Sequence, residues 1–101
     1  MIRHIVFFTL TEKARQEGLE AALEKMRTSA ENMAEKIPGL LRVELNLNMV
    51  KSSSYDLIFY SEFFDLKALE DYQIHPVHVA HKQRFEEYVS NPETADLECK
   101  I

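Results

Sequence analysis

Hydrophobic and polar residues recur along the chain with two different periods, one typical of strands and one typical of helices. Residues 2–10, IRHIVFFTL, and residues 55–64, YDLIFYSEFF, are rich in β-branched and aromatic side chains, which favour strands. Residues 40–48, LLRVELNLN, alternate strictly between apolar and polar, as in a strand with one face in water. Residues 96–101, DLECKI, alternate over a shorter span. The pattern therefore predicts four strands.

Between residues 12 and 36 the apolar side chains recur at steps of three and four, which predicts an amphipathic helix. The apolar stripe, which ends just beyond this range, consists of Leu19, Leu23, Met26, Ala30, Met33 and Ile37. Thr9 and Glu12 have the spacing of a capping box, which predicts where the helix begins. Pro38 and Gly39 predict its end.

A second helical region is expected after Asp65, a suitable N-cap residue. Its first part has an apolar stripe of Leu66, Leu69 and Tyr72. Pro76 interrupts the helix, which then continues to about Val89 with Phe85, Tyr88 and Val89 facing inward. Residues 90–94, SNPET, are expected to form a loop. The order β-α-β-β-α-β predicts a single α+β domain over residues 1–101, with a ferredoxin-like four-stranded antiparallel sheet and helices on one face.

Two of the predicted strands carry apolar side chains on both faces. The side chains on their second faces are Ile5, Phe7, Ile58, Tyr60 and Phe64. Two helices cover only one face of such a sheet, so these side chains would form an exposed apolar patch. We expect an identical sheet to cover this patch in a homodimer with two-fold symmetry. The alternative is a sheet face that is apolar without a partner.

Composition excludes several classes of function. Twelve basic and seventeen acidic residues give a net charge of −5, so we expect no nucleic-acid partner and no binding to anionic membranes. No apolar run is long enough to span a bilayer, and the run IVFF near the N-terminus is shorter than the apolar core of a signal peptide. The single cysteine, Cys99, excludes an internal disulfide, and a cytoplasmic location is expected.

Three of the four histidines lie in residues 71–82, DYQIHPVHVAHK, at a regular spacing of three. His75 and His81 would diverge on an α-helix, and Pro76 moves His75 out of helical geometry. Only His78 and His81 then remain as a pair, fewer than the three or four ligands of a zinc site. We therefore expect no metal site here, although a site completed by other residues is the alternative.

Proton transfer is a better use of this segment than metal binding. A neutral imidazole takes up and returns a proton near neutral pH, so His78 is a candidate acid–base group. Tyr72 offers a hydroxyl that can donate a hydrogen bond to a substrate oxygen as negative charge develops there. The alternative is structural, because Tyr72 also continues the apolar stripe of its helix.

The motif DYQIHPVHVAH, the opening MIRHIVFFTL, and the segments IPGLLRVELNLN and YDLIFYSEFFDLKALEDY resemble the stress-responsive A/B barrel (Dabb) family over most of the chain. The resemblance implies a dimeric α/β barrel made from two sheets. Some members are polyketide cyclases that use no metal or organic cofactor. By this resemblance Tyr72 and His78 are the acid–base pair, with His4 and His75 near the same cavity.

The resemblance also implies a reaction in outline: His78 would abstract a proton next to a carbonyl, and Tyr72 would stabilise the enolate oxygen. Leu57 departs from the cyclases, which can carry a polar residue there, so we expect an apolar pocket that includes Phe8, Leu57 and Phe59. Two functions rank first, ahead of oxygen chemistry by analogy with dimeric barrel monooxygenases and of metal binding. One is a cyclase-like or lyase enzyme without a cofactor, acting on a small carbonyl compound, and the other is a stress-associated module that only binds a small apolar ligand.

Overall fold

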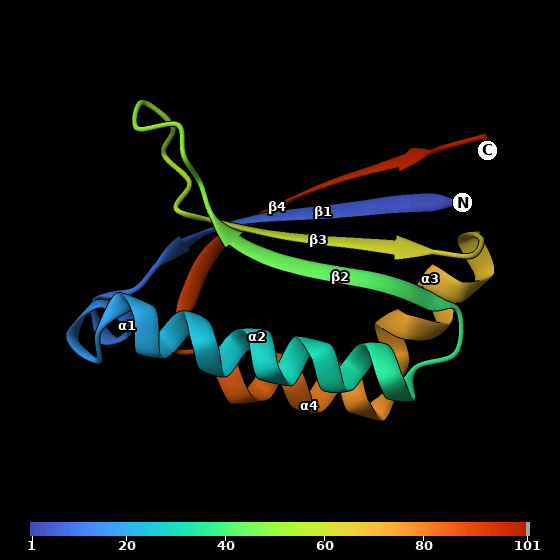
Figure 1. Cartoon of the computed structure of the whole chain (residues 1–101), viewed down its shortest axis with the longest axis horizontal. Coiled ribbons are helices and arrows are strands. Elements are labelled where there is room, and N and C mark those ends of the chain that lie inside the picture. The colour runs from blue at the N-terminus through green and yellow to red at the C-terminus, as the bar shows by residue number, and fades with distance from the viewer. Residues whose placement is uncertain (101) are drawn as a thin grey trace.

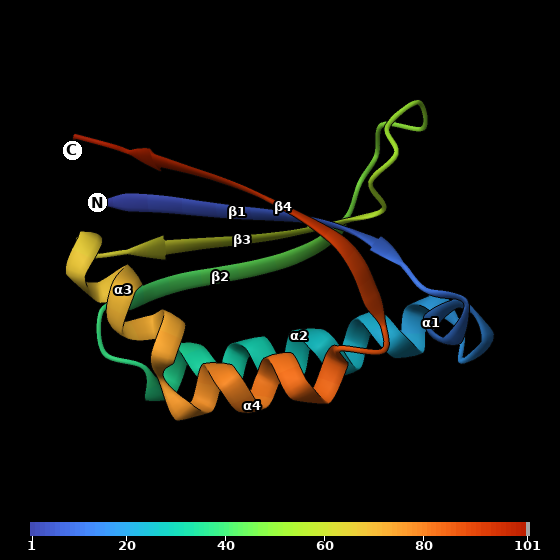
Figure 2. The same cartoon turned by 180° about the vertical axis from the view of Figure 1, so that it is seen from behind.

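A four-stranded antiparallel sheet carries the helices on one of its faces (Figures 1 and 2). The computed structural model describes residues 1–100. The strands are β1 (Ile2–Leu10), β2 (Leu40–Leu47), β3 (Leu57–Phe63) and β4 (Val89–Glu98), in the sheet order β2-β3-β1-β4. The helices are α1 (Glu12–Gln16), α2 (Leu19–Lys36), α3 (Leu66–Ile74) and α4 (Pro76–Phe85). The predicted ferredoxin-like fold is confirmed.

The first helical region consists of two helices, although its periodicity predicts one. Gly18 separates α1 from α2 with φ of +96°, in the left-handed region that favours glycine. Thr11 caps α1, and its side-chain oxygen accepts a hydrogen bond from the backbone N–H of Ala14. The predicted capping box at Thr9 is wrong, because Thr9 belongs to β1 and its hydroxyl hydrogen-bonds to Ser90 on β4.

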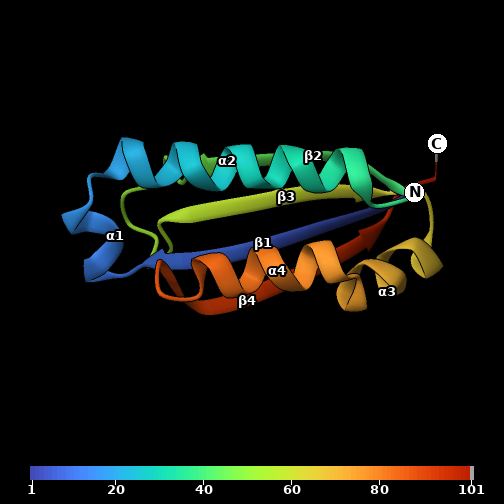
Figure 3. The same cartoon turned by 90° about the horizontal axis from the view of Figure 1, so that it is seen from below.

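The second helical region is interrupted where Pro76 predicts it. Asp65 caps α3 as expected, accepting a hydrogen bond from the backbone N–H of Ala68. His75 adopts an extended backbone between α3 and α4, and Pro76 occupies the first turn of α4. A proline is tolerated there because the first helical N–H groups have no partner within the helix. The break turns the chain, so that α4 runs beside α2 across the sheet (Figure 3).

The end of the chain departs from the sequence prediction. Helix α4 ends at Phe85, before the expected Val89, and residues 90–94 lie within β4 where a loop is predicted. Strand β4 pairs only with β1, from Leu10 opposite Val89 to Ile2 opposite Glu98. An edge strand tolerates Pro92, which would remove a hydrogen bond from a central strand. The predicted strand over 96–101 ends at Glu98, and Ile101 lies outside the described residues.

The face of the sheet toward the helices holds the core. Alternate residues of β1 and β3 point into it, and Phe59, Ser61 and Phe63 are buried there. The alternation of β2 is less strict than its sequence predicts. The pairing register between β2 and β3 shifts between Leu40 and Arg42, so that Leu40 is buried and Leu41 is exposed.

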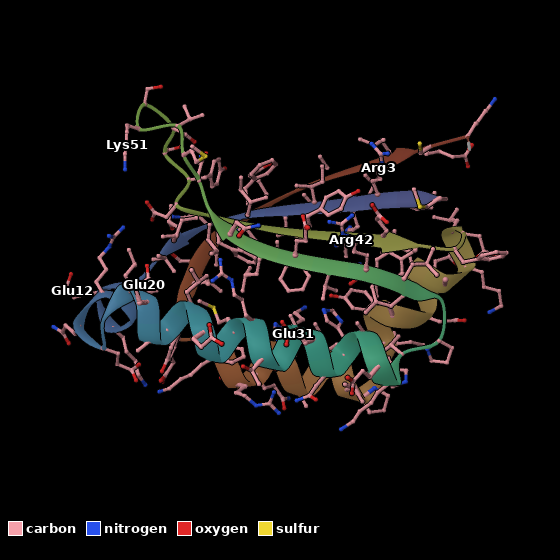
Figure 4. All side chains as sticks on the ribbon, in the orientation of Figure 1. Arg3, Glu12, Glu20, Glu31, Arg42 and Lys51 are labelled. Atoms are coloured by element: carbon pink, nitrogen blue, oxygen red, sulfur yellow. The ribbon has the colours of Figure 1, made fainter. Side chains whose placement is uncertain are left out.

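Within residues 1–100 no helix covers the opposite face of the sheet, which we call the open face. Its central part consists of the partly buried side chains of Ile5 and Phe7 on β1 and Ile58 and Tyr60 on β3, paired as Ile5 with Tyr60 and Phe7 with Ile58. Arg3 and Arg42 lie on this face, away from the helices (Figure 4). The loop between β2 and β3 projects beyond the sheet on the same side (Figure 1). None of the helices in residues 1–100 is long and apolar enough to cross a membrane.

Candidate functional site

A cavity of about 500 Å³ lies between the sheet and the helices. Strands β1 and β3 supply its floor, helices α3 and α4 supply much of the opposite wall, and β4 forms one edge. Six of the seven residues predicted for the site line it: His4, Phe8, Leu57, Phe59, Tyr72 and His78. The fold therefore brings His4, near the start of the chain, into the same cavity as Tyr72 and His78, far along the sequence.

His75 is the predicted site residue that does not line this cavity. It caps α4 instead, and its Nδ1 accepts a hydrogen bond of 3.1 Å from the backbone N–H of Val77. The extended backbone that Pro76 imposes on the preceding residue turns the imidazole back onto its own helix. The structure therefore places His75 outside the lining of this cavity, as the cap of α4.

Tyr72 and His78 pack against each other at the cavity wall. Their rings are stacked with centroids 3.9 Å apart and an interplanar angle of 25°. Tyr72 is 3% exposed, and its hydroxyl makes no hydrogen bond to another residue within 1–100. Burial raises the pKa of Tyr72 above its usual value. The hydroxyl therefore stays protonated and can donate a hydrogen bond to a molecule in the cavity.

His78 is neutral at physiological pH. Burial lowers its pKa from 6.5 to about 4, an effect that the nearby backbone of Gln73 partly opposes and the charge of Lys82 reinforces. Its Nδ1 is enclosed without a hydrogen-bond partner in the part of the chain that the structure describes. An imidazole in this state is a weak base, which reduces its capacity to remove a proton from carbon.

His4 has a carboxylate partner that the sequence reasoning missed. Its Nδ1 hydrogen-bonds to the Asp96 carboxylate across the β1–β4 pair, where the two residues are register partners. A carboxylate acceptor places the proton of a neutral imidazole on Nδ1 and leaves Nε2 as the basic nitrogen. The sequence points to this pair only through the register between β1 and β4. That register can be derived only when the residue at which β4 begins is known.

His81 also lines the cavity, through a ring that contacts Phe59 and Phe85 edge-on. Its Nδ1 lies 2.7 Å from the Ser29 hydroxyl on α2. Burial lowers the pKa of His81 to about 4, and the neighbouring His78 and Arg84 side chains add to the shift. The three-residue spacing places His78 and His81 on the same side of α4, whereas Ser29 gives no signal in the sequence.

The polar atoms are suited to acid–base chemistry or to binding an oxygen-containing ligand. Within residues 1–100 no group of three or more His, Cys, Asp or Glu side chains is arranged to share a metal ion. Apolar side chains from β1, β3 and α2 line much of the remaining wall, among them Val6, Phe8 and Met26, and polar side chains near α3, α4 and β4 line the rest. A ligand that fits must be largely apolar, with oxygen atoms toward the imidazoles and the tyrosine.

Comparison with known proteins supports this fold. The chain is similar to a dimeric protein of unknown function with a ferredoxin-like fold from Bacteroides fragilis NCTC 9343, with 28% identity, a TM-score of 0.82, and coverage of 97% of this chain and 95% of that one. It is also similar to a Dabb family protein with a ferredoxin-like fold from Mesorhizobium loti, with 28% identity, a TM-score of 0.77, and coverage of 98% and 96%.

A more distant neighbour is a hydroxynitrile lyase from Passiflora edulis, with 12% identity, a TM-score of 0.76, and coverage of 95% of this chain and 90% of that one. At this identity the likeness shows the fold alone. No curated protein matches the chain. The family model for the stress responsive A/B barrel domain, Dabb, matches residues 2–99. The match confirms the resemblance of the sequence motifs, and the chain belongs to the stress responsive A/B barrel domain family.

Proposed function

We propose that this protein is an acid–base enzyme that acts on a small, largely apolar carbonyl compound without an organic cofactor. The observation that carries the proposal is the meeting of one tyrosine hydroxyl and three imidazoles in a cavity of about 500 Å³ whose β1 and β3 walls are largely apolar. Charge that develops on a substrate oxygen in such a cavity interacts strongly with a fixed donor, because little water competes. The reaction class is proton removal next to a carbonyl, followed by bond formation or elimination.

Tyr72 is the proposed donor to the carbonyl oxygen, since its hydroxyl is protonated and has no partner within residues 1–100. The base is one of two histidines. His78 lies against Tyr72 but is weakly basic. His4 is paired with Asp96, and its ring centroid lies 6.3 Å from that of Tyr72. We favour His4 as the base and His78 as a neutral wall of the site. The C–H electron pair then forms the enolate, and the proton moves to Nε2 of His4.

Solvent exchange tests this chemistry without knowledge of the natural substrate. Proton removal from acetophenone in D₂O replaces the methyl hydrogens with deuterium, which NMR detects. The wild-type protein should accelerate the exchange above the buffer rate, and Tyr72→Phe and His4→Gln should each remove most of the acceleration. His78→Gln should retain more activity than His4→Gln. A wild-type protein that binds acetophenone without accelerating exchange would contradict the enzyme proposal.

A second candidate function is ligand binding without turnover. The low pKa values of His78 and His81 favour it, because a neutral, weakly basic imidazole can hydrogen-bond to a ligand but is a poor base for removing a proton. Under this alternative Tyr72→Phe and His78→Gln retain acetophenone affinity within a few-fold. Neither the wild-type protein nor any variant then accelerates deuterium exchange above the buffer rate.

We also propose that two copies of the chain pair through the open face. Several structural neighbours are described as dimeric, among them the Bacteroides fragilis protein. In this chain Ile5, Phe7, Ile58 and Tyr60 form an apolar centre on the face without helices. Polar groups lie beside that centre, including the Tyr60 hydroxyl, which donates to Glu62, and Arg3. A second copy supplies the same pattern in two-fold symmetry, so that apolar centres meet.

A further inference from the structure

Ser29 on α2 and Arg84 on α4 form a polar contact behind the cavity wall. The Arg84 guanidinium donates a hydrogen bond of 2.5 Å to the Ser29 hydroxyl oxygen, and the same oxygen lies 2.7 Å from Nδ1 of His81. Ser29 and His81 are more than nine-tenths buried, whereas Arg84 is exposed. A chain of hydrogen bonds therefore leads from the surface between α2 and α4, which lie side by side in Figure 3, to the cavity.

The direction of these hydrogen bonds follows from the chemistry of the groups. A guanidinium only donates, so the Ser29 oxygen accepts from Arg84. The serine hydrogen is then free to donate, and Nδ1 of His81 is the acceptor within reach. In the opposite arrangement, with the proton on Nδ1, the Ser29 oxygen would accept twice and its buried hydrogen would have no partner among the described residues.

The proton of the neutral His81 ring therefore lies on Nε2. Nε2 makes no hydrogen bond to another residue within 1–100, and it is not among the fully enclosed atoms without a partner. Because His81 lines the cavity, this N–H is accessible to a molecule inside it. Burial of the ring, with the neighbouring Arg84 charge as a smaller effect, disfavours a positive charge on His81, so the neutral donor form persists.

We propose that His81 is a specificity-determining residue that donates a hydrogen bond from Nε2 to an oxygen atom of the cavity ligand, and that Ser29 and Arg84 hold it in this tautomer. The inference rests on the proposed function only in that the ligand occupies the same cavity. It adds a requirement to that ligand, which must carry an acceptor oxygen toward α4. Ser29 and Arg84 are positioning residues, since they act through the imidazole.

The tautomer is measured directly by ¹H–¹⁵N correlation spectra of protein with ¹⁵N-labelled histidine, near neutral pH and without ligand. His81 should show its proton on Nε2. Two other histidines serve as internal references, because His75 accepts at Nδ1 from Val77 and His4 donates from Nδ1 to Asp96. In Ser29→Ala the proton of His81 should distribute between Nδ1 and Nε2. Ser29→Thr keeps a hydroxyl and should return the proton to Nε2. A wild-type His81 with its proton on Nδ1 would overturn the inference.

The ligand contact is tested in the Tyr72→Phe background, where the single oxygen of acetophenone is free to reach His81, with two probes of similar shape, acetophenone and ethylbenzene, of which only the ketone accepts a hydrogen bond. His81→Phe retains an aromatic ring beside Phe59 and Phe85 and removes the N–H. It should weaken acetophenone binding by about three- to tenfold and leave ethylbenzene binding unchanged. Equal loss for both probes would show that His81 only fills space. Neither measurement depends on turnover, so a failure of the proposed enzyme activity leaves both results interpretable.

Discussion

Desolvation determines the charge state of the cavity histidines. His78 and His81 are 6% and 9% exposed, and burial lowers the pKa of each to about 4. Both rings must be neutral for the chain to fold around them at little cost. The folded state consequently resists protonation at two positions where the unfolded chain accepts a proton at pH 6.5.

The pH dependence of stability follows from this difference. Between pH 6.5 and about pH 4 the unfolded state binds more protons at His78 than the folded state, so the free energy of unfolding falls as the pH falls. The stabilising contribution is present above pH 6.5 and is lost through this window. We expect His78 to account for roughly 1 to 2 kcal/mol between about pH 7.5 and about pH 5.

Urea unfolding at the two pH values measures this contribution, at one protein concentration. In His78→Phe the ring remains against Tyr72 but no longer titrates, so the fall in stability should be smaller than in the wild-type protein. His75→Asn is the matched control, because it removes an imidazole outside the cavity and keeps a capping side chain. If His78→Phe loses as much unfolding free energy between the two pH values as the wild-type protein does, His78 is not buried as a neutral ring.

A second prediction at this scale concerns the Tyr72 hydroxyl. Because it has no hydrogen-bond partner within residues 1–100, Tyr72→Phe should change the free energy of unfolding by less than about 1 kcal/mol. The same variant should lose deuterium exchange into acetophenone. Tyr60→Phe, which removes a hydroxyl that donates to Glu62 outside the cavity, should lose no exchange. A stability loss above this limit would identify a structural hydrogen bond of Tyr72 and argue against a role in catalysis.

The individual site residues differ in how far the sequence predicts them. Tyr72 and His78 follow from a local motif, and the alternation of β1 and β3 places His4, Phe8 and Phe59 on the face toward the helices. Asp96 and Ser29 do not follow, because each is recognised only through a contact with a histidine distant in the chain. His75 shows the opposite failure: a local capping bond decides its direction, and spacing alone does not reveal it.

At the scale of elements, the turn that connects α2 to β2 depends on a glycine. Gly39 has φ of +83°, and a Cβ there would lie 2.5 Å from the Cβ of Ala68 on α3. Gly18, before α2, has φ of +96° but open space around it. The two glycines therefore separate backbone strain from steric overlap.

Gly39→Ala should lower the free energy of unfolding by about 2 kcal/mol or more, since it combines backbone strain with overlap against the Cβ of Ala68. Gly18→Ala should cost about 1 kcal/mol, because it introduces strain alone. Urea unfolding of the two variants under the same conditions gives the comparison. If both variants lose the same stability, α3 yields to the added methyl group and the close packing of Gly39 on Ala68 is unimportant.

Element prediction succeeds where one physical signal dominates. The apolar stripe of α2 and the alternation of β2 each reflect burial on one side, and Pro76 predicts the break between α3 and α4. Prediction fails at β4, whose residues 91–98 are exposed and carry no apolar periodicity. Its conformation is determined by pairing with β1, a contact between opposite ends of the chain.

At the scale of the whole molecule, the sheet has one covered face and one open face. The helices cover the face that holds the cavity, while Ile5, Phe7, Ile58 and Tyr60 remain only partly buried on the other. The β2–β3 loop projects on the same side (Figure 1), and Met49 in this loop is 90% exposed. A second copy that covers this face removes the apolar patch from water.

The proposed pairing predicts a particle of twice the 11.8 kDa chain mass by light scattering after size exclusion. Ile58→Glu places a charge in the middle of the open face, where burial in a dimer would leave it without a partner, so we expect monomers or aggregates. Val79→Glu is the matched control, because Val79 is on the solvent side of α4 and should tolerate the charge without loss of the dimer. Circular dichroism establishes that both variants fold. A folded Ile58→Glu protein of unchanged double mass would place the interface elsewhere.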